Sequence, residues 1–265
     1  MPQKVGILVV GNEILDGIIL ESNSRWLTNR LKPLGFQFWE RMIVRDDVEE
    51  IAKAIKRMVE DNCKLIITSG GLGPTHDDMT LKGIAHAFNL RMGVNREALE
   101  IVTRQYKELH NRGIIENENV TEARMKMAIL PVGSTPLDNR VGGAPGVHLH
   151  VNDVEIISLP GVPSELEWIT DNQLIPLLNQ YVDGIYYEEI MNLPLRDESS
   201  LAPLIDEVMK RVPDVWVKSM VKPYGEMGIR LWISTRGYDR DQVVNKVKNA
   251  VTILRELINS SLPNG

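Results

Sequence analysis

The sequence of 265 residues lacks the features that mark secreted, membrane-spanning or disulfide-stabilised proteins. Its single cysteine, Cys63, cannot form an internal disulfide or a thiolate metal cluster. The longest apolar run near the start, Val5 to Val10, is interrupted by Gly6 and is far too short to cross a membrane. Because no basic stretch, apolar segment and small-residue cleavage site open the chain, no secretory signal is visible and a cytoplasmic location is expected.

Charge of one sign is not concentrated in any block of the sequence. Thirty Lys and Arg residues stand against 36 Asp and Glu residues, which gives a net charge of −6. This balance repels phosphate polymers, so nucleic acid is not the expected partner, and no membrane partner is expected either. The hydrophobic share of 43% with 25% charged residues is typical of a soluble globular protein, and the length predicts one large domain with a smaller companion.

Apolar periodicity predicts that strands and helices alternate in the first part of the chain. Strands are expected at residues 5–10, 36–44 and 64–68, separated by a helix that begins near Asn23 and by a second helix at residues 48–61. The strands are apolar on both faces, which is typical of parallel sheets. The pattern therefore predicts an α/β fold with a doubly wound, mainly parallel sheet.

The last third of the chain follows a different pattern. A boundary is expected at Val182 to Gly184, which separates a large domain at residues 1–182 from a smaller one at residues 183–265. In the smaller domain we expect strands at 186–193, 215–221 and 227–235, a helix at 199–211 and a final helix with a 3.6-residue apolar period. This succession predicts a small α+β domain.

The segment from Ser69 to Thr80 is the part of the chain best suited to bind a ligand. Gly70, Gly71 and Gly73 directly follow a predicted buried strand, where open α/β sheets bind ligands. Glycine backbones allow a close approach and expose N–H groups that bind phosphate oxygens. No Gly-Lys-Ser/Thr closes the loop and the glycine spacing is not that of the dinucleotide fingerprint, so the predicted phosphate site is of neither type.

Two adjacent carboxylates, Asp77 and Asp78, follow these glycines. Hard carboxylate oxygens beside a phosphate site suit Mg²⁺ or a similar divalent ion, which bridges phosphates and activates water. Either aspartate could instead cap the helix that begins near Met79. Glu13, after the first strand, is expected near this loop because both leave the same edge of the sheet; an exposed turn residue is the alternative.

Several other residues have two possible roles. Asn23 is either a helix cap or a ligand contact, and His76 either contacts a phosphate or is merely exposed. Gly225-Glu-Met-Gly228 has the form of a KH loop, but it contains Glu226 and joins two predicted strands, so a hairpin turn is favoured. Lys218, Lys222 and Arg230 add modest positive charge nearby, and a solvated sheet face is their simplest role.

Five motifs resemble, in order and spacing, those of the CinA family. They are Gly11-Asn12-Glu13-Ile14-Leu15-x-Gly17, Glu21-Ser-Asn-Ser-Arg-Trp-Leu27, Gly70-Gly-Leu-Gly-Pro-Thr-x-Asp-Asp-x-Thr80, Asn139-x-x-Gly-x-Ala-Pro-Gly146 and Leu159-Pro-Gly-Val-Pro-Ser-Glu165. The first domain of that family is similar to the molybdopterin-binding domain of MoaB, MogA and MoeA proteins. The stretch from Ser199 on resembles the small KH-like domain of CinA proteins. The resemblance implies a MoaB/Mog-like fold followed by a KH-like domain.

The resemblance also implies a reaction. It indicates a divalent-metal-dependent nucleotide pyrophosphatase acting on ADP-ribose or a related dinucleotide, with Asp77, Asp78 and Glu13 as catalytic groups. Asp77 and Asp78 would hold the metal, which would be Mg²⁺, Mn²⁺ or Co²⁺. The alternatives are a non-catalytic or cofactor-biosynthetic protein that binds molybdopterin or a nucleotide, and an RNA-associated protein that uses the small domain. Asn12 replaces the acid of the molybdopterin relatives, which argues against their reaction.

Relatives of this fold also imply a homo-oligomer and, because the sequence ends at Gly265, no amidohydrolase domain is expected. The amides of Gly70 to Gly73 and of Thr75 are expected to hold one phosphate, opposite a wall built from residues 139–146. The implied substrate-binding residues are Gly11, Asn12, Asn23, Gly70, Gly71, Gly73, Thr75, Thr80, Asn139, Gly143, Pro145, Gly146, Pro160, Gly161 and Glu165.

Overall fold

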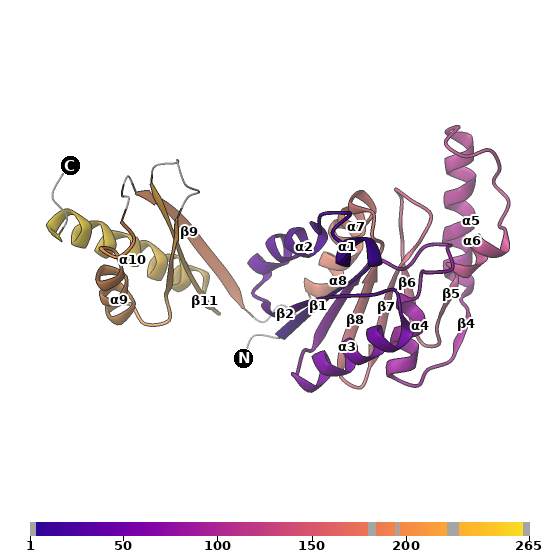
Figure 1. The fold of residues 1–265 in the computed structure, drawn as a ribbon, viewed down its shortest axis with the longest axis horizontal. Helices are drawn as coiled ribbons and strands as arrows, with labels where there is room; N and C mark the ends of the chain where they lie inside the picture. The colour runs from indigo at the N-terminus through magenta and orange to yellow at the C-terminus, as the bar shows by residue number, and fades with distance from the viewer. Residues whose placement is uncertain (1–3, 180–183, 194, 196, 222–227, 262–265) are drawn as a thin grey trace. The chain divides into compact units, whose positions relative to one another are not determined.

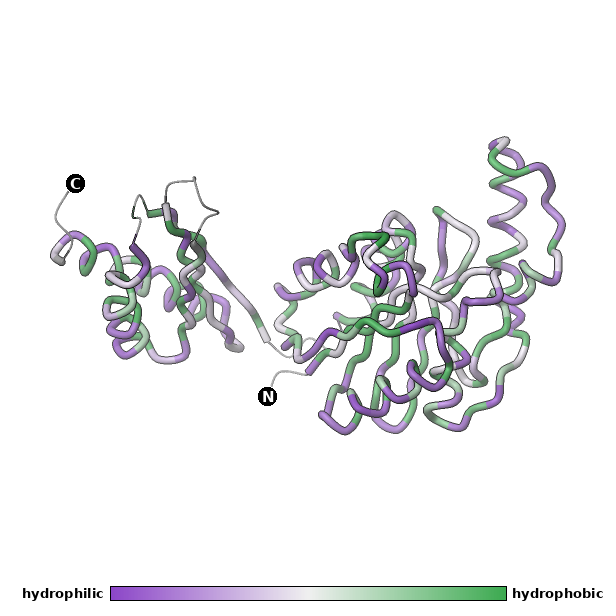
Figure 2. The backbone as a smooth tube through the Cα atoms, in the orientation of Figure 1, coloured by the Kyte–Doolittle hydropathy of each residue, from purple (hydrophilic) through white to green (hydrophobic). Residues whose placement is uncertain are grey.

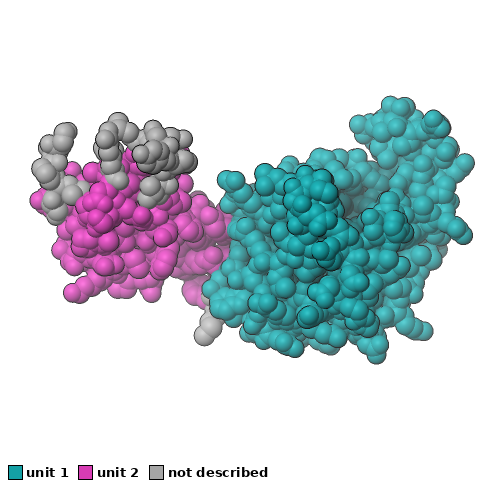
Figure 3. Space-filling view, viewed as in Figure 1, with its two compact units in different colours: residues 1–31, 37–181 teal, residues 32–36, 182–265 magenta. Residues whose placement is uncertain are grey.

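The computed structural model describes residues 4–179, 184–193, 195, 197–221 and 228–261, which form two compact units (Figures 1 and 3). Residues 1–31 and 37–181 form the larger unit, and residues 32–36 and 182–265 form the smaller unit. Most of the predicted boundary at 182–184, Lys222 and most of the Gly225 to Gly228 motif lie outside the described residues. Among the residues that the structure describes, no helix is long and apolar enough to cross a membrane.

The larger unit contains a six-stranded sheet with the order β2-β1-β3-β8-β7-β6. Neighbouring strands are parallel from β2 to β8 and antiparallel from β8 to β6, so the predicted mainly parallel sheet is confirmed. A separate antiparallel pair is formed by β4 and β5. The strands are β1 (Lys4–Val10), β2 (Gln37–Val44), β3 (Leu65–Ser69), β4 (Met92–Val94), β5 (Ile129–Pro131), β6 (Thr135–Leu137), β7 (Gly146–Val151) and β8 (Val154–Leu159).

Helices cover both faces of this sheet, α3 and α4 on one face and α2, α7 and α8 on the other (Figure 1). Hydrophobic residues accordingly concentrate along its central strands (Figure 2). The helical segments are α1 (Asn12–Leu15), α2 (Asn23–Leu31), α3 (Val48–Glu60), α4 (Thr80–Ala87), α5 (Arg96–Asn111), α6 (Glu122–Lys126), α7 (Pro163–Ile169), the π-helical η2 (Thr170–Leu174) and α8 (Ile175–Leu178).

Helix α3 illustrates how the local sequence produces this packing. Asp47 caps its N-terminus by accepting hydrogen bonds from the amides of Glu49 (2.9 Å) and Glu50 (3.1 Å). Ile51 and Ile55, one turn apart, are fully buried against the sheet and α4. The capped, amphipathic helix therefore packs its apolar face on the strands whose carboxyl ends form the site.

The smaller unit is a three-stranded antiparallel sheet with the order β10-β11-β9 and two helices on one face. Its elements are η1 (Lys32–Leu34), β9 (Ile185–Leu193), α9 (Ala202–Arg211), β10 (Trp216–Val221), β11 (Ile229–Gly237) and α10 (Arg240–Ser261). Leu231 and Ile233 of β11 are buried with Val208 of α9 and Leu254 of α10. The predicted small α+β fold is confirmed, and the short segment 32–36, distant in sequence, belongs to it.

Candidate functional site

A pocket of about 600 Å³ lies where parallel strands of the larger unit end. Because β1, β2, β3 and β8 run parallel, the segments that follow them emerge at one edge of the sheet. Each contributes to the wall: Glu13 after β1, Asp46 after β2, residues 69–75 with Asp77 and Asp78 at and after the end of β3, and residues 160–163 with Glu165 after β8. The pocket therefore occupies the ligand-binding position of this fold class. The glycine-rich loop forms part of it, as the sequence predicts.

The glycine-rich loop is tied to the start of helix α4. Gly70 and Gly71 have φ angles of +98° and +67°, in the left-handed region that glycine adopts most easily. A Cβ at Gly70 would clash with the carbonyl oxygen of Val10, and one at Gly71 with the hydroxyl of Thr80. Thr80, fully buried, donates its Oγ1 hydrogen to the Gly70 carbonyl oxygen at 2.7 Å. Thr80 thus fixes the loop from behind and does not line the pocket.

Two of the amides expected to hold a phosphate are already occupied. The amide of Gly70 donates to the Leu159 carbonyl oxygen at 3.0 Å, which joins the loop to β8. The amide of Thr75 donates to Oδ2 of Asp78 at 2.7 Å. The expectation that these two amides bind phosphate is therefore wrong, because internal acceptors saturate them. Within the described chain, the amides of residues 71–73 make no such bond.

Asp77 and Asp78 converge on Thr75 rather than capping α4. The Thr75 hydroxyl lies 2.5 Å from Oδ1 of Asp77 and 2.5 Å from Oδ2 of Asp78. The hydrogen bond from Thr75 lowers the pKa of Asp77. The residue at the N-cap of α4 is Met79, and no side chain caps the helix there. The helix-cap alternative for these aspartates is therefore wrong, and both carboxylates line the pocket.

Lys126 lies beside this acidic pair without lining the pocket. Its ammonium group donates a hydrogen bond to the Thr75 carbonyl oxygen. Burial lowers the pKa of Lys126, although the charges of Asp78 and Asp77 act in the opposite direction. Lys126 therefore braces the loop that carries the two aspartates.

Asp46 is a pocket carboxylate that the sequence interpretation did not include. Its Oδ2 accepts a hydrogen bond from the amide of Asn12 at 2.8 Å. Burial raises the pKa of Asp46, and the negative charges of Glu13, Asp77 and Asp78 raise it further, whereas the Asn12 bond lowers it. Four carboxylates thus share one electrostatic environment. The signal was available, since Asp46 follows β2 just as Glu13 follows β1.

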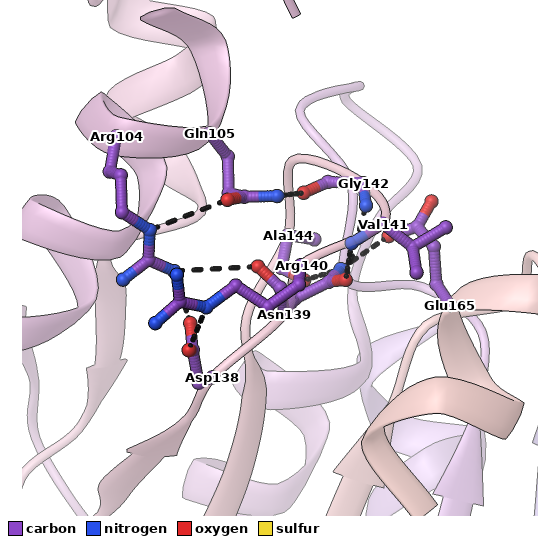
Figure 4. Close-up of polar contacts among 9 residues, drawn as sticks. All are labelled: Arg104, Gln105, Asp138, Asn139, Arg140, Val141, Gly142, Ala144 and Glu165. Carbon is purple, nitrogen blue, oxygen red and sulfur yellow. Dashed lines mark hydrogen bonds and ion pairs between the residues drawn. The ribbon is translucent and has the colours of Figure 1, made fainter. Parts of the chain in front are cut away.

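The opposite wall is organised by Asn139 (Figure 4). Its Nδ2 donates to the Ala144 carbonyl oxygen and to Oε2 of Glu165, each at 2.7 Å. Its Oδ1 accepts from the amides of Val141 (2.9 Å) and Gly142 (3.1 Å). Asn139 is fully buried, so it shapes the 139–146 loop instead of lining the pocket, whereas Glu165 lines it. Burial raises the pKa of Glu165, although the Asn139 bond lowers it.

Helix α5 supports this wall from outside the sheet (Figure 4). Gln105 donates its Nε2 hydrogen to the Gly142 carbonyl oxygen at 3.0 Å, and Arg104 forms an ion pair with Asp138. Tyr106 lines the pocket, and its ring carries the Arg124 guanidinium 4.0 Å from its centroid. A Cβ at Gly143 would approach the Tyr106 ring to 2.9 Å. Gly143 therefore leaves room for this aromatic ring.

The remaining expected site residues divide between the pocket surface and its support. Asn23 lines the pocket, and its Nδ2 donates to Ser69 Oγ at 3.0 Å and to the Gly161 carbonyl oxygen at 2.8 Å. It therefore joins the ends of β3 and β8. Among the described residues its side chain makes no capping bond, because the amide of Ser24 donates to Glu21 Oε1 instead, so the helix-cap alternative is wrong. Residues that line the pocket are Glu13, Asn23, Gly70, Gly71, Gly73, Thr75, Asp77, Asp78, Gly143, Pro160, Gly161 and Glu165. The expected site residues that do not line it are Gly11, Asn12, Thr80, Asn139, Pro145 and Gly146.

The pocket is strongly acidic. Of the residues that the structure describes, six carboxylates line it and no Lys, Arg or His does. These carboxylates are Glu13, Glu21, Asp46, Asp77, Asp78 and Glu165. The charges of the lining would therefore repel a bare phosphate anion on balance. His76 is exposed and does not line the pocket, which agrees with the alternative that it is merely an exposed loop residue.

The carboxylates suit a hard divalent ion that keeps much of its own water. Among the described residues, no three His, Cys, Asp or Glu side chains are grouped closely enough to hold a metal ion by themselves. Mg²⁺ and similar ions are commonly bound by one or two carboxylates, with water and phosphate oxygens completing the shell. Asp77 and Asp78, which converge on one hydroxyl, fit this mode of binding.

Comparison with known proteins agrees with the arrangement of the larger unit. Residues 6–180 match the family described as "Probable molybdopterin binding domain". Protein PH0439 of Pyrococcus horikoshii is 37% identical over 246 residues, covering 91% of each chain, and Protein LS215_2186 of Saccharolobus islandicus is 33% identical over 264 residues, covering 97% of each. The structure of the protein CinA, of unknown function, from Thermoplasma acidophilum is 32% identical, with a TM-score of 0.59.

That CinA structure matches 69% of this chain and 99% of its own. The family match covers well over half of the chain and includes every segment that lines the pocket. The chain therefore belongs to the molybdopterin-binding domain family and, within it, to the CinA proteins.

Proposed function

We propose that the larger unit binds a phosphate-bearing nucleotide together with a divalent metal ion and hydrolyses the diphosphate of ADP-ribose or a related dinucleotide. The observation that carries this proposal is the pairing of a glycine-rich loop with six carboxylates and no basic side chain in one pocket. A ligand phosphate would repel this lining unless a cation lay between them. Metal binding and ligand binding are thus expected to depend on one another.

The residues divide the work between binding and chemistry. Asp77 and Asp78, supported by Glu13 and Asp46, would hold Mg²⁺, Mn²⁺ or Co²⁺, which when bound would offset phosphate charge and lower the pKa of the attacking water. The amides of residues 71–73 would donate to phosphate oxygens. Leu72, Tyr106 and Met127 belong to the apolar part of the lining and would contact the heterocycle.

The reaction is a simple hydrolysis. Water attacks one phosphorus of the diphosphate and the bridging P–O bond breaks, so that ADP-ribose yields AMP and ribose 5-phosphate. The carboxylates of Glu13, Asp46, Asp77 and Asp78 line the same pocket and interact electrostatically, and they would hold the metal. Glu165, on the wall opposite the glycine-rich loop, would contact the ligand.

The direct test is to incubate the purified protein with ADP-ribose and Mg²⁺, Mn²⁺ or Co²⁺ and to separate the products by chromatography. We expect AMP to form with a metal ion and not with EDTA. Asp78→Asn should lower kcat at least about a hundredfold, because it removes a charge that holds the metal. Asp153→Asn, at the exposed β7–β8 turn, is the matched control and should leave kcat unchanged.

A second candidate is a binding or cofactor-biosynthetic role with molybdopterin or a nucleotide as ligand, which the family match favours. Native mass spectrometry of the protein as purified distinguishes the two. A retained pterin or nucleotide whose binding is insensitive to EDTA, with no turnover of any diphosphate, would replace the hydrolase proposal by this one. Metal-dependent AMP release would exclude it as the sole function.

A further inference from the structure

The three-stranded sheet of the smaller unit has one covered and one open face. On the covered face, Val217 of β10 and Leu231 and Ile233 of β11 are buried under α9 and α10. Side chains alternate along a strand, so their neighbours in sequence point to the opposite face. Trp216 (55% exposed) and Ile190 (57% exposed) lie on that face and are open to solvent. Tyr186 and Ser234 on the same face are buried, so only part of the face is open.

The register places aromatic and basic side chains side by side on the open face. Lys218 of β10 pairs with Trp232 of β11, which pairs in turn with Ile190 of β9. Each such set of three paired residues is a rung across the sheet. The next rung with side chains on this face is Met220, Arg230 and Asn192, and the rung on the other side is Trp216, Ser234 and Glu188. Trp216 and Trp232 are therefore diagonal neighbours, within reach of one another across the strands.

The charge of this face is positive. Lys218 and Arg230 are exposed, and neither takes part in an ion pair with the described residues. The one acid in the three rungs, Glu188, is neutralised because Lys32 Nζ donates to its Oε2 at 2.6 Å. Trp232 Nε1 donates to the same oxygen at 2.6 Å, which fixes the orientation of the indole. The face thus presents the exposed ring of Trp216 and the cations Lys218 and Arg230, whereas Trp232 is half-buried with Lys32 Nζ 5.3 Å from its ring centroid.

The net charge of −6 disfavours nucleic acid only if it is spread over the whole chain. Residues 32–36 and 182–265 contain twelve basic and twelve acidic side chains, so the smaller unit has no net charge. The larger unit therefore carries the whole net charge of −6. Repulsion of a polyanion is therefore a property of the acidic larger unit. It does not apply to the open face of the smaller sheet.

We propose that this open face, formed by Trp216, Lys218, Arg230 and Trp232, binds single-stranded nucleic acid. Bases stack on exposed aromatic rings without regard to sequence, while Lys and Arg contact the phosphates between them. Trp216 is the stacking surface, and Lys218, two residues further along β10 and opposite Trp232, would contact a backbone phosphate. This binding is independent of the diphosphate chemistry proposed for the larger unit.

The test is fluorescence anisotropy with labelled twelve-nucleotide oligo(dT) and oligo(U), titrated with the full chain at low and high KCl. We expect binding to both or to one of them, weakening as salt rises because bound phosphates release counterions. Trp216→Ala should weaken binding roughly tenfold, the loss typical of one stacked base. Lys218→Glu should weaken it at least as much and reduce the salt dependence.

Two matched controls lie in the same unit but away from this face. Tyr238→Ala removes an exposed aromatic ring after β11, and Lys210→Glu reverses a charge on α9, which covers the other face. Both should bind like the unmodified chain, and circular dichroism should show that all four variants fold. Absence of binding at low salt, or equal loss in the controls, would overturn the proposal. So would a Trp216-dependent dimer without oligonucleotide binding, which would make the face an interface between two copies.

Discussion

Asp46 changes the electrostatics of the pocket although its strand carries no recognisable motif. Its carboxylate is held in place by the amide of Asn12 and repelled by three other carboxylates of the same wall. A divalent cation is the simplest way to relieve that repulsion. Asn12 therefore contributes to this wall through its backbone amide.

Replacing Asp46 by Asn removes one charge and leaves an oxygen that can still accept from Asn12. Under the proposed function, we expect kcat for ADP-ribose at saturating Mn²⁺ to fall at least about tenfold and the metal concentration for half-maximal rate to rise. Steady-state kinetics over a Mn²⁺ series measure both values. Asp47→Asn is the matched control, because Asn retains the helix-capping bonds of the adjacent residue. Unchanged kinetics in Asp46→Asn would exclude it from the metal environment.

Glu165 is expected to make stability depend on pH. Burial raises its pKa in the folded protein, so the folded state holds this proton more tightly than the unfolded chain does. Its stabilising contribution is complete at low pH and is lost as pH rises through the folded pKa. Glu165→Gln should therefore be more stable than the unmodified protein at pH 7 and equally stable near pH 4.

Urea unfolding at the two pH values measures this difference. Glu167→Gln, on the same helix, controls for the loss of one negative charge. A gain that does not change between pH 4 and pH 7 would show that packing, and not proton binding, is responsible.

At the scale of elements, the connection between the glycine-rich loop and α4 determines the shape of the pocket. Thr80 joins them through its hydroxyl, and its amide donates to the Gly71 carbonyl oxygen at 3.2 Å. The loop follows β3 and precedes α4, as the apolar pattern of the sequence predicts. The glycines alone do not determine which amides of the loop remain available to a ligand. The amide of Gly70 is occupied by the Leu159 carbonyl oxygen of β8, and the amide of Thr75 is occupied by the Asp78 carboxylate.

Thr80→Val keeps the volume of the side chain and removes its hydrogen bond. Because the Gly70 carbonyl oxygen then loses a buried donor, we expect the free energy of unfolding to fall by about 1–3 kcal/mol. Thermal unfolding followed by circular dichroism measures the loss. Thr103→Val is the control, since its hydroxyl makes a similar bond to Leu99 on the exposed side of α5. An equal effect in both variants would contradict a special role for Thr80.

At the scale of the whole molecule, each unit has its own hydrophobic core. Buried residues of the smaller unit cluster around Leu231, Val247 and Leu254, and those of the larger unit form separate clusters around its sheet. The larger unit contains Trp26, Trp39 and Trp168, and the smaller contains Trp216 and Trp232. Chains with two cores commonly do not unfold in one step.

We therefore expect urea unfolding to show two transitions. A ligand stabilises the state that binds it, so Mn²⁺ with ADP-ribose should raise the midpoint of the larger unit's transition. Val208→Ala leaves a cavity in the smaller unit and should lower the other midpoint, by about 1–3 kcal/mol in free energy. Circular dichroism and single-tryptophan variants can follow the two events. One coincident transition in all these measurements would show that the units unfold cooperatively.

Much of this architecture follows from the sequence by local rules. Apolar strands followed by glycine and aspartate, with capped amphipathic helices between them, predict a parallel sheet and a ligand site at its carboxyl edge. The family motifs predict the acidic pair, Glu13 and the residues around Asn139, because they lie in short continuous segments. Local sequence determines these features since each depends on residues a few positions apart.

Tertiary structure decided what no local pattern specifies. Asp46 lines the pocket only because β2 lies beside β1. The amide of Gly70 is unavailable to a ligand only because β8 pairs with β3 and supplies the Leu159 carbonyl oxygen as its acceptor. Asn139 and Thr80 are conspicuous in the motifs but are buried as supports, since neighbouring chain segments bind their side-chain polar atoms. The open tryptophan face likewise requires the pairing of three separate strands. Hydrogen bonds and charges act between residues that are close in space, and the fold alone sets those distances.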